Sequence, residues 1–251
     1  MPRGLLGFAA VRGFIDLHCH WIAGVDDGAP SEEEGVAMLL ALHQAGFDRV
    51  MATPHMRVGM FDNDRPALVA AYERMTASLH GTSGLPELGL GCEHYFDDVV
   101  YQRLRAGEGL PYPGERAVLL EFYGMDFPPV VVERLFDLRR GRLLPVIAHP
   151  ERYRYLWGKP DALERLVDAG IATLLDAAAL VGKYGREPQR AAEMLLDRGL
   201  YHAACSDAHR AADVADVARG MDRVVDLFGE EELDFLFREG PRTILEGKLP
   251  E

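Results

Sequence analysis

The sequence has 251 residues, 48% of them hydrophobic, and a formal net charge of −13. This length can bury one large core, and the acidic balance argues against a nucleic-acid-binding protein, which needs a basic face to displace counterions. The three cysteines, Cys19, Cys92 and Cys205, lack the spacing of a disulfide scaffold, and no segment approaches the roughly 20 apolar residues of a membrane helix. We therefore expect a cytoplasmic protein without membrane insertion.

The predicted elements alternate between short apolar runs and amphipathic segments after residue 13. Residues 1–13 are expected to be an N-terminal extension, and residues 14–251 a single domain. We predict strands at 13–17, 48–53, 87–92, 117–122, 144–148, 171–176 and 201–205. We predict helices at 31–46, 65–79, 129–140, 161–169, 188–198 and 212–228. The stretch 93–115 is expected to be the least regular part.

This alternation predicts an α/β fold with mostly parallel strands whose faces are covered by helices. Ser31 and Glu34 have the spacing of a capping box, which marks the start of the first helix. At this length a closed or nearly closed TIM-like barrel is favoured, with a doubly wound open sheet as the alternative.

Two histidines at the end of the first predicted strand stand two residues apart. His18 and His20 belong to the segment Asp16-Leu17-His18-Cys19-His20. Residues i and i+2 of a strand point to the same face, so both imidazoles can reach one metal ion. Alone, this pattern is a modest signal, because surface or core histidines produce it by chance.

Other metal-competent side chains stand at or just past the ends of later predicted strands. They are His55, Glu93, Glu121, His149, Asp207 and His209. Barrel active sites are assembled at the carboxyl ends of strands, so these positions predict one shared metal site. Asp27, in the loop around Asp26 and Gly28, fits either a ligand or a simple Asp-Gly turn. The remaining histidines lack this placement and are left out of the site: His43, His80, His94 and His202.

Three arginines near these positions are candidates for phosphate binding, because a planar guanidinium matches phosphate oxygens. Arg57 follows His55 by two residues, Arg152 follows His149 by three, and Arg210 follows His209 directly. A surface salt bridge is an equally good explanation for Arg57. A cysteine phosphatase is excluded, because its nucleophile is followed six residues later by an arginine and no cysteine of this chain has that neighbour.

The assembled motifs resemble the polymerase and histidinol phosphatase (PHP) superfamily. Within it the chain is most similar to the bacterial protein-tyrosine phosphatases encoded with capsule and exopolysaccharide genes. The similarity rests on seven segments together with the closing Gly240–Leu245 and covers nearly the whole chain after residue 13. The seven segments are Phe14–His20, Val25–Gly28, Ala52–His55, Gly91–Glu93, Leu119–Phe122, Pro145–Arg152 and Ser206–His209.

This resemblance implies a distorted (β/α)7 barrel with three divalent metal ions, usually Mn²⁺ and sometimes Mg²⁺, Co²⁺, Zn²⁺ or Fe. It implies that His18, His20, Glu93 and Asp207 hold the first ion. Glu93, Glu121 and His149 would hold the second, and Asp27, His55 and His209 the third. Arg152 matches an arginine that binds the substrate phosphate in that group. A second arginine, expected seven or eight residues after Asp207, is replaced here by Val214 and Ala215, so Arg57 or Arg210 would substitute for it.

The implied function is a protein-tyrosine phosphatase that acts on a phosphotyrosine protein, the tail of a bacterial tyrosine kinase that regulates polysaccharide synthesis. We hypothesise in-line transfer of the phosphoryl group to water, with Arg152, Asp207 and His209 as the catalytic residues. The alternatives are a phosphatase of a small ester such as histidinol phosphate, a catalytically silent regulator that binds the kinase, and an exonuclease-like enzyme, which the acidic charge disfavours.

Overall fold

The computed structural model describes residues 12–122 and 129–250. The strands that it contains are β1 Phe14–Asp16, β2 Phe47–Ala52, β3 His55–Met56, β4 Glu87–Leu90, β5 Glu93–Tyr95, β6 Ala117–Glu121, β7 Leu144–Ala148, β8 Ala172–Asp176 and β9 Ala203–Cys205. The α-helices are α1 Glu32–Gln44, α2 Arg65–Ser78, α3 Asp98–Arg105, α4 Pro129–Arg140, α5 Pro160–Asp168, α6 Arg186–Asp197, α7 Val214–Phe228, α8 Glu230–Asp234 and α9 Gly240–Leu245.

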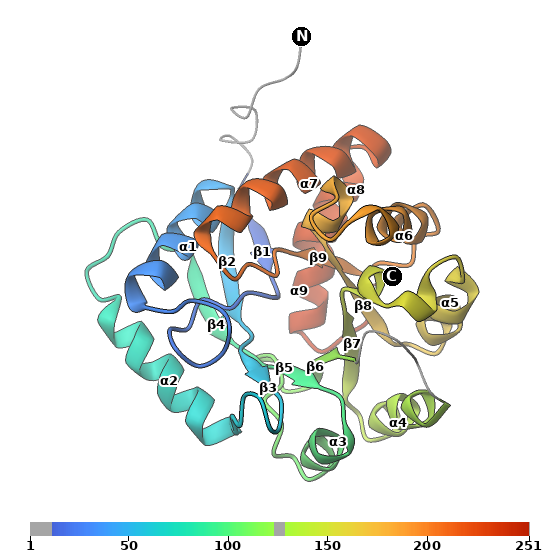
Figure 1. Ribbon diagram of the computed structural model, residues 1–251, viewed down its shortest axis with the longest axis horizontal. Coiled ribbons are helices and arrows are strands. Elements are labelled where there is room, and N and C mark those ends of the chain that lie inside the picture. The colour runs from blue at the N-terminus through green and yellow to red at the C-terminus, as the bar shows by residue number, and fades with distance from the viewer. Residues whose placement is uncertain (1–11, 123–128, 251) are drawn as a thin grey trace.

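All strand pairs among these elements are parallel, and they form two hydrogen-bonded sheets. The first has the order β1-β2-β4 and the second the order β3-β5-β6-β7-β8-β9. β3 continues the path of β2, and β5 continues that of β4, so the nine strands occupy seven positions. Pro54 lies between β2 and β3 and has no N–H to donate, which accounts for the interruption of the ladder there. Figure 1 shows the strands at the centre and helices around them.

The first and last strands are joined at their carboxyl ends. Cys19 and Ala208 form a parallel bridge, and the backbone N–H groups of His20 and Asp207 donate to Ala208 and His18 across this seam. Asp16 accepts hydrogen bonds from both the backbone and the hydroxyl of Ser206 on the same seam. The fold is therefore the distorted seven-stranded α/β barrel that the sequence predicts.

Alternation along the strands divides the core into an inner and an outer part. Ala117 and Leu119 of β6 belong to the inner cluster, while Val118 and Leu120 belong to the outer cluster under the helices. The carboxyl-terminal residue Glu121 continues the inner series, since residues two apart share a face. The inner side chains thus lie below a polar rim. Two residues of α9, Ile244 and Leu245, also pack against the inner cluster.

Most predicted elements are present with shifts of one or two residues at their ends. Ser31 caps α1 by accepting from the backbone N–H of Glu34, as the capping-box spacing predicts. The prediction for 93–115 is wrong, because this stretch contains β5 and α3. Asp97 caps α3, and Val100, Tyr101 and Leu104 form its buried face. Helices α8 and α9 were also not predicted.

Part of the expected N-terminal extension, residues 1–11, lies outside the described residues. Among the residues that the structure describes, no helix combines the length and the apolar character that crossing a bilayer requires. All three cysteines are buried free thiols.

Candidate metal centre

The nine side chains that the sequence nominates as ligands gather at the carboxyl rim of the barrel. Four groups of three or four of them bring their ligand atoms within 4.8 Å of one another. These groups are His18, His20 and Asp207; His18, Glu93 and His149; His55, Glu93 and Glu121; and His20, Asp27, His55 and His209. Segments from one end of the chain to the other therefore meet at one place.

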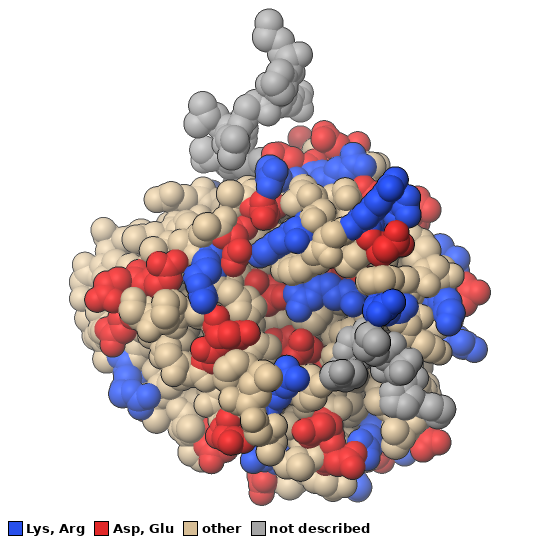
Figure 2. Space-filling model, viewed as in Figure 1, with Lys and Arg blue, Asp and Glu red and all other residues tan. Residues whose placement is uncertain are grey.

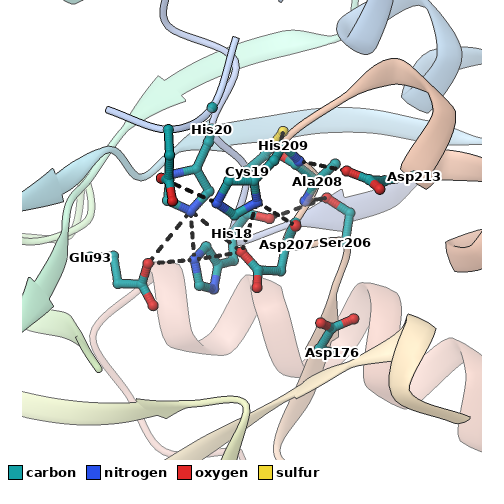
Figure 3. A network of polar contacts seen from close by, with 12 residues as sticks. His18, Cys19, His20, Glu93, Asp176, Ser206, Asp207, Ala208, His209 and Asp213 are labelled. Carbon is teal, nitrogen blue, oxygen red and sulfur yellow. Dashed lines mark hydrogen bonds and ion pairs between the residues drawn. The ribbon is translucent and has the colours of Figure 1, made fainter. Parts of the chain in front are cut away.

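The deepest part of the site joins the first and last strands. His18 Nε2 lies 3.1 Å from His20 Nε2 and 3.2 Å from Asp207 Oδ1. His20 Nε2 lies 3.4 Å from the same carboxylate oxygen. Figure 3 shows His18, His20, Glu93 and Asp207 pointing toward one another. His18 and His20 follow β1 rather than lying within it, yet their imidazoles converge as the i, i+2 spacing predicts.

Glu93 stands at the centre of the cluster and uses both carboxylate oxygens. Its Oε1 lies 3.1 Å from His149 Nε2, and its Oε2 lies 3.1 Å from both His18 Nε2 and His55 Nδ1. One carboxylate thus faces histidines from three different strand ends. This arrangement suits a bridge between two ions.

The outermost group lies nearest to solvent. Asp27 Oδ1 is 3.4 Å from His55 Nε2 and 3.5 Å from His209 Nε2. The ring of His209 stacks on that of His20, with centroids 4.1 Å apart. Asp27 therefore lies close to two histidines. Its place in an Asp-Gly turn had left open whether it is a ligand or only part of the turn.

These distances fit metal coordination. Donor atoms about 2.1 Å from one ion are about 3.0–3.4 Å apart at neighbouring octahedral or tetrahedral positions, and the separations given above fall close to that range. Several of these buried atoms have close polar neighbours but no contact with the geometry of a hydrogen bond among the described residues, including His55 Nδ1, Glu121 Oε2 and Asp207 Oδ1. Buried polar atoms rarely lack a partner, so the donor set fits divalent cations.

Electrostatics also favour cations at this place. Burial, together with the Glu93 carboxylate, raises the pKa of Glu121 to about 7. Burial and the neighbouring Arg152 lower the pKa of His149 to about 4, so its imidazole is neutral and able to donate a lone pair. The carboxylates of Asp27, Glu93, Glu121 and Asp207 repel one another in this small volume. Bound divalent ions would offset that repulsion.

The chain is similar to known proteins in both sequence and structure. The family described as "Capsular polysaccharide synthesis, CpsB/CapC" matches residues 14–246. The tyrosine-protein phosphatase YwqE of Bacillus subtilis is 32% identical over 196 residues, which are 78% of this chain and 77% of YwqE. The chain belongs to the CpsB/CapC family.

Further relatives agree with this assignment. The tyrosine-protein phosphatase CpsB of Streptococcus pneumoniae is 25% identical over 94% of this chain and 99% of its own. A solved structure from work on YwqE and CpsB, described there as metal-dependent tyrosine phosphatases, has a TM-score of 0.85 and 27% identity. It covers 94% of this chain and 96% of that chain. An Escherichia coli phosphotriesterase homology protein, with 14% identity and a TM-score of 0.57, shares the fold.

Two ligand candidates of this CpsB/CapC chain have unusual backbone conformations. His149 has φ 35° and Asp207 has φ 44°, both in the left-handed region that non-glycine residues seldom adopt. Such strain is concentrated at functional sites, where the surrounding structure holds it in place. These turns direct both side chains over the rim just after β7 and β9.

The structure adds carboxylates that the sequence analysis did not assign to the site. Asp26 Oδ2 accepts from His20 Nδ1 at 2.8 Å and from the backbone N–H of His55 at 3.0 Å. The first bond fixes the proton on Nδ1 and leaves His20 Nε2 free as a ligand. Asp176, which ends β8, contacts Arg152 at 3.4 Å. The strand-end rule used for the other ligands would have found Asp176.

The three nominated arginines have different surroundings. A cavity of about 390 Å³ beside the cluster is lined by Asp27, Arg152, Lys183, Tyr184, Asp207, His209, Arg210 and Asp213. Arg152 lies in it, 2.6 Å from Asp207 Oδ2. Arg57 is not among the lining residues, and its guanidinium packs over the Tyr95 ring at 4.1 Å. Figure 2 shows Lys and Arg side chains close to acidic side chains at the centre of this face.

The four histidines left out of the site are also absent from these ligand groups. His94 Nδ1 hydrogen-bonds to the carbonyl of Leu119, and His94 Nε2 accepts from the backbone of Leu110. His202 Nδ1 accepts from the backbone of Thr173. Both are structural side chains of the core.

Proposed function

We propose that this chain is a metal-dependent protein-tyrosine phosphatase, a phosphoric monoester hydrolase. The observation that carries the proposal is the convergence of nine nitrogen and oxygen donors beside an arginine-lined cavity. Membership of a family whose curated relatives are named tyrosine-protein phosphatases supports the substrate. The metal dependence described for YwqE and CpsB supports the cofactor.

We propose three divalent ions, with Mn²⁺ as the first choice. Their ligands would be the nine side chains named above, with Glu93 as the bridge. The donor set has nitrogen and oxygen atoms only, which favours ions of borderline to hard character. Glu93 is shared between two groups in the structure, and this supports a centre with more than one ion.

The residues around the cavity have separate parts in the proposed reaction. Bound divalent ions would supply Lewis-acid stabilisation and lower the pKa of an attacking water. Arg152 would hold non-bridging phosphoryl oxygens, and its contact with Asp207 Oδ2 orients the guanidinium for that purpose. The phenolate leaving group has a pKa near 10, so it needs less help from a general acid than an alkoxide. Asp207 and His209 are the candidates for that help.

The partner that we propose is a bacterial tyrosine kinase tail that carries phosphotyrosine, in the control of capsular or extracellular polysaccharide synthesis. The match to a capsular polysaccharide synthesis family supports this choice. We also propose a cytoplasmic location, supported by three free thiols, and one domain over residues 14–251. Substrate contacts by Arg57 and Arg210 remain part of the proposal; Arg210 lines the cavity and Arg57 does not.

Hydrolysis of a phosphotyrosine peptide tests the function directly. We expect turnover with Mn²⁺, loss of turnover after chelation, recovery on adding Mn²⁺ back, and little activity on histidinol phosphate. The reverse substrate preference would contradict the tyrosine phosphatase. Absence of any metal-dependent phosphatase activity, p-nitrophenyl phosphate included, would indicate the silent regulator.

A further inference from the structure

A tight turn beyond β8 places two side chains in the wall of the cavity. Gly182 and Gly185 flank Lys183 and Tyr184, and the N–H of Gly185 donates to the carbonyl of Gly182 at 3.0 Å. Both glycines have positive φ, 80° and 99°, which other residues adopt only with strain. The sequence Gly-Lys-Tyr-Gly therefore builds a turn whose two central side chains line the cavity.

Tyr184 connects this turn to Arg152, the residue proposed to bind the substrate phosphate. The Arg152 guanidinium lies over the Tyr184 ring, 4.7 Å from its centroid, and Lys183 Nζ lies 5.5 Å from the same centroid. Two cations thus flank one aromatic ring at the edge of the candidate centre. A phosphoryl group bound by Arg152 would lie within reach of a flexible lysine side chain.

The three cationic side chains that line the cavity, Arg152, Lys183 and Arg210, have different partners. Arg152 contacts the carboxylates of Asp207 and Asp176. Arg210 Nη1 donates to the backbone carbonyls of Asp27, Gly28 and His209 and thereby ties two loops together. The carboxylate that Lys183 contacts is that of Asp213, at 2.8 Å.

The other contacts of Asp213 allow the Lys183 ammonium group to move away from its carboxylate. Asp213 Oδ2 separately accepts the backbone N–H groups of His209 and Arg210, at 3.0 and 2.9 Å. The carboxylate therefore keeps two hydrogen bonds when the ammonium group departs. Both side chains are 20% exposed, so water reaches the pair and can solvate the ammonium group as it moves. Figure 3 shows Asp213 beside His209 at the rim.

We propose that Lys183 is a substrate-binding residue whose ammonium group exchanges Asp213 for the phosphoryl oxygens of the substrate. This inference rests on the proposed phosphatase function. Lysine binds phosphate as a point charge with three donors, whereas Arg152 binds it through a planar fork. Together they would hold the non-bridging oxygens from two directions, with Tyr184 as the positioning residue between them.

The test compares Lys183→Gln with Lys248→Gln in the metal-loaded full chain. Lys248 is an exposed lysine paired with Glu246, so its substitution makes the same chemical change away from the cavity. The probe is inorganic phosphate, measured by calorimetry and as a competitive inhibitor. We expect Lys183→Gln to weaken phosphate binding about tenfold or more and to raise KM, because hydrogen bonds to charged groups are strong. Lys248→Gln should match the wild type, and Lys183→Arg should restore most of the affinity.

Asp213→Asn separates substrate binding from a structural role. This variant releases Lys183 while its amide oxygen can still accept from the backbone, so phosphate affinity should be unchanged or higher. Equal weakening in Lys183→Gln and Asp213→Asn would overturn the inference, as would unchanged phosphate affinity in Lys183→Gln with an unaltered melting temperature. A wild-type protein that binds phosphate but does not hydrolyse phosphotyrosine would overturn the proposed function instead.

Discussion

At the scale of a single residue, Glu93 lies at the centre of the candidate metal centre. It is buried at the start of β5, and its two oxygens face His18, His55 and His149. Burial alone would raise the pKa of Glu93, but the surrounding histidines hold it well below its usual range. The group is therefore an anion prepared for cations, in a position where an uncompensated charge would be costly.

Glu93→Gln should remove metal and activity while leaving the fold in place. The substitution keeps the shape of the side chain but removes the charge that bridges the ligand groups. We expect at least one ion fewer per chain by elemental analysis and a fall in turnover of about 100-fold or more, since outer-shell changes alone cost 10–100-fold.

The matched control for this substitution is Glu87→Gln, on the exposed part of β4. Glu87 contacts Arg49 at 3.4 Å and is 68% exposed, so its loss should change neither metal content nor turnover. Full metal content in Glu93→Gln would contradict the central position given to this carboxylate.

At the scale of elements, the sequence predicted the strands better than the turns between them. Short apolar runs, each followed by polar residues, located the seven strand positions. Strands buried inside a barrel are apolar along their length, so this pattern is easy to recognise. Asp26 and Asp27 are adjacent in the chain, and only the path of the loop decides that Asp26 holds His20 while Asp27 approaches His55. Lys183 and Asp213 meet only because two segments, 30 residues apart in the chain, lie at the same rim.

Helix α3 was missed for a different reason. It has eight residues, and its stretch follows directly on the short strand β5. The cap at Asp97 and the apolar positions Val100, Tyr101 and Leu104 were present in the sequence. A helix of eight residues makes only about two turns, so its periodic pattern of apolar residues is short and hard to recognise among polar neighbours.

His202, which links β8 and β9, makes the stability of this region depend on pH. Burial lowers its pKa to about 4, and its Nδ1 accepts from the backbone of Thr173. Between pH 6.5 and 4 the unfolded chain binds a proton that the folded chain does not, so this contribution to stability falls as the pH falls.

His202→Asn should reduce that loss. Asparagine can keep an acceptor near the position of Nδ1 but does not titrate. From pH 7 to pH 4.5 the wild type should lose about 2–3 kcal/mol more unfolding free energy than the variant, measured by urea denaturation. His80→Asn, at an exposed position, should behave as the wild type. If the unfolding free energy of the wild type and of both variants fell equally with pH, His202 would not be the cause of the pH dependence.

At the scale of the molecule, an acidic protein brings three cationic side chains together at one cavity. The net charge is −13, yet Arg152, Lys183 and Arg210 line the cavity beside the candidate ligands. With divalent ions bound among the carboxylates, this rim would become a local positive region that attracts a dianionic phosphate. The barrel provides the frame, since the strand ends around its rim can each contribute a side chain.

Anomalous X-ray diffraction from crystals of the Mn²⁺-loaded protein tests the central claim most directly. We predict strong peaks at the manganese edge among His18, His20, Asp27, His55, Glu93, Glu121, His149, Asp207 and His209, with Glu93 between two of them. A protein that hydrolyses phosphotyrosine at full rate but shows no anomalous peak at this rim would contradict it.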